Sequence, residues 1–192
     1  CLVESASNYL AVARIEWKAN ATSFGGYALA DVVLANGEVK NDVTIASVNG
    51  NAANATGAVG STYTQGVPTS GSVSIYWTNN SAYYNHIMAY SVNADGSYNL
   101  MNATHYTNAA TKSDKVVDLG GTDANKVGTA SYNNSTATIS DQTNTVVATD
   151  NTVFLYVNDN GYSYTVYTGK NNAPSITAAK MCVKFDSYGY AE

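Results

Sequence analysis

Three short stretches place an aspartate or asparagine directly before a glycine, between runs of aromatic and β-branched residues. They are "LANGEVK" around Asn36-Gly37, "VNADGSY" around Asp95-Gly96 and "VNDNGYSY" around Asn160-Gly161. Glycine adopts positive φ without steric cost, and an Asx side chain can bond to the backbone two residues on, so these dipeptides favour tight turns. Each stretch therefore predicts a β-hairpin, and Asn36-Gly37 is assigned a type I′ turn.

Other stretches show the period of two that is typical of strands. In "YLAVARIEWK", residues 9–18, apolar and charged side chains alternate. Around the second turn, Tyr90 and Val92 are expected to share a face with Tyr98 and Leu100. Further short strands are expected at "GTASY", "TATIS" and "NTVVA".

The strand before the third turn, residues 153–157, is apolar on both faces. In a sheet, a strand with two apolar faces is normally covered on both sides. We therefore expect it to be a central strand.

Composition supports an all-β protein with an extracellular location. Charged residues make up only 12% of the chain, about half the usual fraction, and the many Thr, Tyr and Val residues suit a pleated, half-buried surface. The polar stretch 108–127 contains Gly-Gly and lacks sustained periodicity, which indicates a junction. The sequence therefore predicts two small antiparallel β-sandwich or barrel-like modules in tandem, over residues 1–107 and 128–192.

The charge balance argues against several partners. The formal net charge is −5, and Arg14 is the sole arginine. No basic stripe is available to neutralise phosphates, so nucleic acid and anionic membranes are not expected as partners. No apolar run approaches the roughly 18–20 residues of a membrane span, so no membrane insertion is expected.

The two cysteines leave three alternatives open. Cys1 and Cys182 could form a disulfide that closes nearly the whole chain, which the loop-entropy model values at about 5 kcal/mol. They could instead both be reduced, or Cys1 could carry a lipid. In "KMCVKF", strand alternation places Cys182 on the face of the two lysines, towards solvent or an edge rather than the core.

Catalytic and metal-binding patterns are weak in this sequence. His86 and His105 have no further ligand residues at zinc-site spacing. No Gly-x-Ser-x-Gly elbow is present, and glutamates are too few to favour a glycosidase carboxylate pair. We therefore expect no enzyme activity, no metal and no cofactor.

The aromatic residues carry the remaining functional signal. Trp77, Tyr83 and Tyr84 cluster in "YWTNNSAYYN", and the chain has 16 tyrosines. Exposed aromatic rings beside amides can stack on sugars, but Tyr and Trp are also enriched in packed faces and subunit interfaces. Packing or assembly is the favoured interpretation, with glycan contact as the alternative.

The stretch "NTVFLYVNDNGYSYTVYTGKNNAPSITAAK", residues 151–180, resembles a segment of large cell-surface proteins of Gram-positive anaerobic bacteria that carry S-layer homology domains. The hairpin stretches "SVNADGSYNL" and "LANGEVKNDVTI" also resemble parts of their β-rich regions. The resemblance implies a secreted, modular, non-enzymatic protein at the bacterial cell surface or wall. The repeats that bind wall polysaccharide are absent from these residues, so wall anchoring is not implied.

Together these observations predict a structural segment of a surface layer or surface filament. Its expected partners are other copies of itself or neighbouring surface-protein domains, bound through sheet edges and Tyr-rich faces. The alternative is an adhesion module that binds glycans or a host surface.

Overall fold

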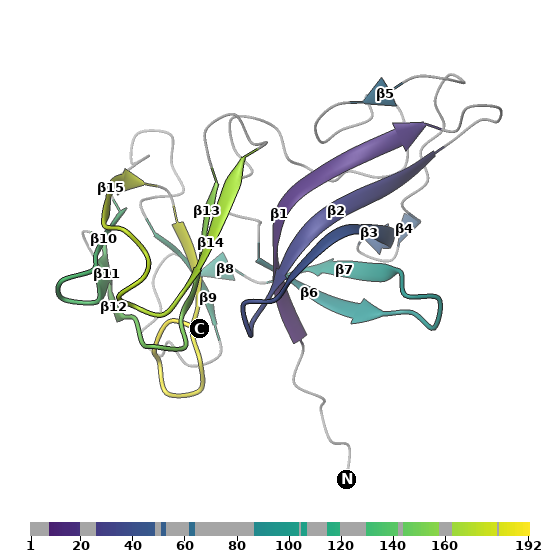
Figure 1. The fold of residues 1–192 in the computed structure, drawn as a ribbon. Helices are drawn as coiled ribbons and strands as arrows, with labels where there is room; N and C mark the ends of the chain where they lie inside the picture. The colour runs from purple at the N-terminus through teal and green to yellow at the C-terminus, as the bar shows by residue number, and fades with distance from the viewer. Residues whose placement is uncertain are drawn as a thin grey trace, which may run out of the picture.

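The computed structural model consists of strands and connecting turns, and every regular element in its described part is a β-strand (Figure 1). The predicted all-β class is therefore confirmed. The structure describes residues 8–19, 26–48, 51–52, 62–63, 87–103, 105–106, 115–119, 130–141, 144–157, 163–179 and 181–192.

The N-terminal half contains a closed barrel whose five strands are β1 (Asn8–Ala19), β2 (Gly26–Leu34), β3 (Val39–Val48), β6 (Ile87–Val92) and β7 (Tyr98–Asn102). β1, β2 and β3 form an antiparallel meander. β6 pairs antiparallel with β1 and β7, and β7 closes the barrel by pairing in parallel with β3. This Greek-key connectivity is that of the OB-fold. Two short strands, β4 (Asn51–Ala52) and β5 (Thr62–Tyr63), pair with β3 and β1.

Alternate residues of these strands fill the barrel. On β2, for example, Ala28, Ala30 and Val32 are buried at i, i+2 and i+4. Three register shifts interrupt the regular pairing: one between Val12 and Arg14 on β1, one between Ala30 and Val32 on β2, and one between Ile45 and Ser47 on β3. Such bulges re-aim side chains. The barrel core consists of Leu10, Val12, Ala28, Ala30, Val32, Ile45, Val48, Met88, Tyr98 and Leu100.

The first two predicted hairpins are present, but the turn of the first differs from the type I′ prediction. In the first, Gly37 N–H donates to Leu34 O at 2.9 Å and Leu34 N–H donates to Glu38 O at 2.9 Å. Gly37 has a φ of 85°, whereas Asn36 keeps a negative φ. A type I′ turn needs positive φ at both central residues, so the assignment was wrong. The turn is a three-residue loop that ends in a left-handed glycine.

The second hairpin repeats this geometry around Gly96, whose φ is 84°. Its strands have the predicted register, with Tyr90 opposite Leu100 and Val92 opposite Tyr98. The Tyr90 and Tyr98 rings stack with centroids 5.7 Å apart. The turn of the third hairpin, around Asn160-Gly161, lies outside the described residues.

The C-terminal half forms a second core between several small sheets. β12 (Thr145–Val147), β11 (Thr138–Ser140), β10 (Ala130–Asn133) and β15 (Ile176–Ala179) form one sheet, in that order; β16 (Met181–Lys184), β9 (Val116–Leu119) and β8 (His105–Tyr106) form another. β10, β11 and β12 are the three predicted short strands. The core consists of Val117, Leu119, Ala130, Tyr132, Ile139, Val146, Ala148, Phe154, Ala173, Val183, Phe185 and Ala191.

Strand β9 lies inside the stretch that was predicted to be a junction. Its Val117 and Leu119 are fully buried in the second core, and it pairs with β16. The polar composition of residues 108–127 therefore conceals one buried strand. The module boundaries stay predictions.

The strand predicted to be central is β13 (Val153–Val157), and its position differs from the prediction. It pairs with β14 (Tyr164–Thr168) in a two-stranded sheet, and no other described strand belongs to that sheet. Figure 1 shows the hairpin between the barrel and the other C-terminal strands. Phe154 packs on Tyr132 in the second core, while β13 also contacts β1 of the barrel. Both faces of β13 are apolar because the hairpin lies between the barrel and the second core. A central place in a sheet, with a strand on each side, is not the reason.

Candidate functional site

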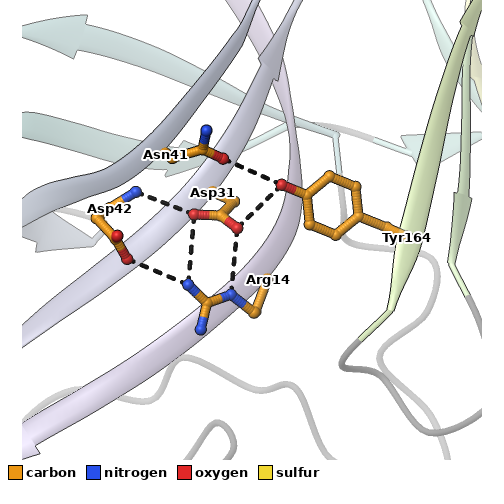
Figure 2. A network of polar contacts seen from close by, with 5 residues as sticks. All are labelled: Arg14, Asp31, Asn41, Asp42 and Tyr164. Carbon is orange, nitrogen blue, oxygen red and sulfur yellow. Dashed lines mark hydrogen bonds and ion pairs between the residues drawn. The ribbon is translucent and has the colours of Figure 1, made fainter.

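A polar network joins the barrel to the β13–β14 hairpin. It consists of Arg14, Asp31, Asn41, Asp42 and Tyr164, and we call it the Asp31 network (Figure 2). The barrel bulges in the β1–β2 and β2–β3 pairings create it, because they place these groups of β1, β2 and β3 together on the outside of the barrel. Asp42 adopts a φ of 51°, a left-handed conformation that Asp tolerates better than most residues.

Asp31 is the acceptor at the centre of the network. Its Oδ1 accepts from the Asp42 backbone N–H at 2.9 Å, and its Oδ2 accepts from Arg14 Nε at 3.2 Å and from the Tyr164 hydroxyl at 2.9 Å. Arg14 Nη2 also donates to Asp42 Oδ1 at 3.1 Å. The Tyr164 oxygen lies 3.2 Å from Asn41 Oδ1. One hydroxyl of the hairpin thus bonds to a buried carboxylate of the barrel.

The electrostatics of the network keep Asp31 charged and Tyr164 neutral. Burial raises the pKa of Asp31, but the hydrogen bonds from Asp42, Arg14 and Tyr164 and the charge of Arg14 together lower it below its ordinary value. Burial and the bond to the Asp31 carboxylate raise the pKa of Tyr164. Asp31 is therefore charged and Tyr164 protonated near neutral pH, and the hydrogen bond between them links the barrel to the β13–β14 hairpin.

A cavity of about 610 Å³ lies beside this hairpin. Its walls come from β1, β2 and β6 of the barrel and from β10, β11, β13, β15 and β16 of the second half. Most of the lining side chains are apolar, among them Val33, Ile87, Leu155 and Met181. This volume is in the range of ligand sites, which occur preferentially between domains.

The charged groups in the cavity wall neutralise each other. Lys184 Nζ lies 3.1 Å from Glu192 Oε2 and donates to Phe185 O at 2.6 Å. The same ammonium lies 5.1 Å from the centroid of the Tyr9 ring on the barrel. This cation–π contact is a second link between barrel and C-terminal half.

Most residues predicted to form a site lie outside the described part of the chain. Trp77, Tyr83, Tyr84, Cys1 and His86 all fall there, so their roles and the proposed disulfide stay predictions. His105 lies in β8. Within the described residues, no group of three or more His, Cys, Asp and Glu side chains is placed to hold a metal ion.

Cys182 lies on β16 opposite Asp118 and lines the cavity. Val183 and Phe185 on the other face are buried in the core. The face that carries Cys182 and Lys184 is not simply open to solvent, however, because Lys184 packs against Tyr9 and its side chain is only 12% exposed.

Sequence reasoning missed the Asp31 network. One signal was available: Asp31 interrupts the apolar strand "ALADVVLA", where a charge needs a partner, and Arg14 is the sole arginine. The link to Tyr164, 133 positions away, had no signal in the sequence.

Fold and site together define an all-β protein with a closed Greek-key barrel and a second β core that meet at a polar network and an apolar cavity. No family model, curated protein or solved structure matches this chain. The described residues include no helix long and apolar enough to span a membrane.

Proposed function

We propose that this chain is a non-enzymatic structural segment of an extracellular bacterial surface layer or surface filament. Its copies would associate through open strand edges and exposed tyrosines. The observation that carries the proposal is the contrast between the two halves. The barrel is closed, whereas the second half consists of small sheets. Two of their outer strands, β15 and β8, have no further described strand beside them, although Ala191 and Glu192 bond to Val147 of β12 and Lys184 of β16. Unpaired edges are templates for association with another chain.

Exposed aromatic residues support the same function. Tyr188 is 85% exposed at the tip of a turn that Asp186 Oδ1 stabilises by accepting the Tyr188 and Tyr190 N–H groups at 2.8 and 2.9 Å. Tyr190 is also exposed. A rigid turn that presents aromatic rings loses little conformational entropy on binding, which suits a contact between copies.

The test is the assembly state of the purified chain. Sedimentation velocity over a wide concentration range should show concentration-dependent association, and negative-stain electron microscopy should show lattices or filaments. A chain that stays monomeric at the highest concentration, with neither form of assembly, would contradict the proposal.

Glycan binding is a second candidate because of the barrel. OB-fold barrels bind oligosaccharides on the face of their second and third strands. Tyr27 of β2 is 41% exposed, and because it is next to the buried Ala28 in the strand, its side chain points to the outside of the barrel. A glycan array should lose signal with Tyr27→Ala or Trp77→Ala if this function is correct, and should show no signal for the wild type if it is wrong.

A further inference from the structure

The cavity lies along an unpaired edge of β13. The Val153 N–H donates to Glu192 O at 3.2 Å, away from β14. Backbone groups alternate in direction along a strand, so the N–H and C=O groups of Leu155 and Val157 point to this same side. Among the described strands, β14 alone pairs with β13. The edge beyond Val153 is therefore open.

The shape of the lining shows that the cavity follows strand edges. A cavity against one face of a strand is lined by alternate residues, since neighbouring side chains point in opposite directions. Here every residue from Thr152 to Val157 lines the cavity, as do residues 176–179 of β15 and 181–184 of β16. The cavity is thus a slot between strands.

An extended peptide fits this slot better than a small apolar molecule. A small apolar molecule would cover the open N–H and C=O groups of Leu155 and Val157 without bonding to them, and each buried group without a partner is costly. A peptide strand would pair with them and place apolar side chains against the walls. The occupant must also be uncharged there, because Lys184 and Glu192 already neutralise each other.

We propose that this slot binds an extended strand from a second copy of the chain, and that residues 72–77, "SVSIYW", are that strand. The inference rests on the proposed self-association and names its site. The segment lies outside the described residues and carries no charge, and Val73, Ile75 and Trp77 alternate with Ser72, Ser74 and Tyr76. The other stretches outside the described residues are rich in Gly, Asn or Ala, or carry charges. Six residues span about 20 Å as a strand, enough to pair along the whole of β13.

The test uses the full chain and one variant on each side of the contact. Leu155→Lys places a charge in the slot, and Ile75→Lys places one on the donor. Thr165→Lys is the matched control, because Thr165 is exposed on the neighbouring strand β14 and does not line the cavity. Val157→Lys at the end of β13 serves as a second slot variant if Leu155→Lys disturbs folding, which circular dichroism reports.

Sedimentation velocity should show that each slot or donor variant weakens association by about tenfold or more, because an ammonium in an apolar site without a partner is strongly disfavoured. Thr165→Lys should associate like the wild type. A mixture of Leu155→Lys and Ile75→Lys should recover association, since each chain retains the half that the other lacks.

Cys182 provides an independent readout in a Cys1→Ser background, because it lines the slot. The rate at which a maleimide labels it should fall as protein concentration rises. If the wild type associates while the slot and donor variants match it, or if the labelling rate is independent of concentration, the strand-donation site is wrong and self-association stands. If the wild type does not associate at all, both proposals fail.

Discussion

Asp31 is almost completely covered, yet it keeps its charge because backbone, guanidinium and hydroxyl donors all face it. A buried ion pair is a weak source of net stability compared with apolar packing, but removing one partner is costly, since the other stays desolvated. Arg14 is 29% exposed and also bonds to Asp42, which limits that cost. The role of Asp31 is therefore orientation: it sets where Tyr164 and its hairpin attach.

Asp31→Asn is expected to lower the free energy of unfolding by about 1–3 kcal/mol, the usual range when a buried hydrogen-bonded group loses its partners. Asp42→Asn is the matched control. Its side chain is 62% exposed, so its loss should stay within about 1 kcal/mol. Urea denaturation followed by circular dichroism measures both, and equal losses in the two variants would contradict a central role for Asp31.

Acid should weaken the wild type through the same carboxylate. The folded-state pKa of Asp31 lies below its ordinary value, so folding favours the charged form. This contribution is complete above the unfolded pKa, near 3.9, and is lost as the pH falls through the folded pKa. Below about pH 4, the wild type should therefore lose stability more steeply than Asp31→Asn. Parallel stability curves for the two proteins down to the acid limit would show that Asp31 is not responsible.

At the scale of elements, local turn chemistry was readable from the sequence and pairing partners were not. Asn36-Gly37 and Asp95-Gly96 located two hairpins correctly, because a left-handed glycine is a local requirement. The turn type predicted for Asn36-Gly37 was wrong, because the length of the loop depends on which strand residues pair. The central position predicted for β13 was wrong. Two apolar faces show that a strand is covered, but they do not reveal whether neighbouring strands or whole modules cover it.

The two glycine turns offer a matched test of the contact between barrel and hairpin. Gly37 and Gly96 have nearly the same φ, 85° and 84°. A Cβ on Gly37 would lie 2.7 Å from Thr168 Oγ1 on β14, whereas a Cβ on Gly96 would meet nothing within 4 Å. Both Ala variants should pay a backbone cost of about 1 kcal/mol or more, and Gly37→Ala should pay more than Gly96→Ala.

Adding Thr168→Ala to Gly37→Ala should recover the difference, because it removes the clashing oxygen. Urea denaturation of the four proteins measures the effect. If Gly37→Ala and Gly96→Ala are equally destabilised, the barrel turn does not press against β14.

At the scale of the whole molecule, the sequence supported an all-β chain with modules in tandem, since charge is low throughout and period-two patterns recur in both halves. The barrel closure was not predictable, because the parallel pairing of β3 with β7 joins strands about 50 positions apart through a stretch without strong patterning. The interface between the barrel and the second core was not predictable either. Its contacts, Tyr164 to Asp31 and Lys184 to Tyr9, join residues that no local pattern connects.

These contacts should make the two halves unfold together. In a Cys1→Ser and Trp77→Phe background, fluorescence reports Trp17 on β1 of the barrel, while thiol labelling of Cys182 on β16 reports the second half. The two urea transitions should coincide, which is the mark of a single cooperative unit. Asp31→Asn combined with Tyr164→Phe removes the central bond between the halves, so the transitions should separate, whereas they should stay together in Asp42→Asn. Coincident transitions in the double variant would mean that apolar packing around β13, and not the Asp31 network, couples the barrel to the second core.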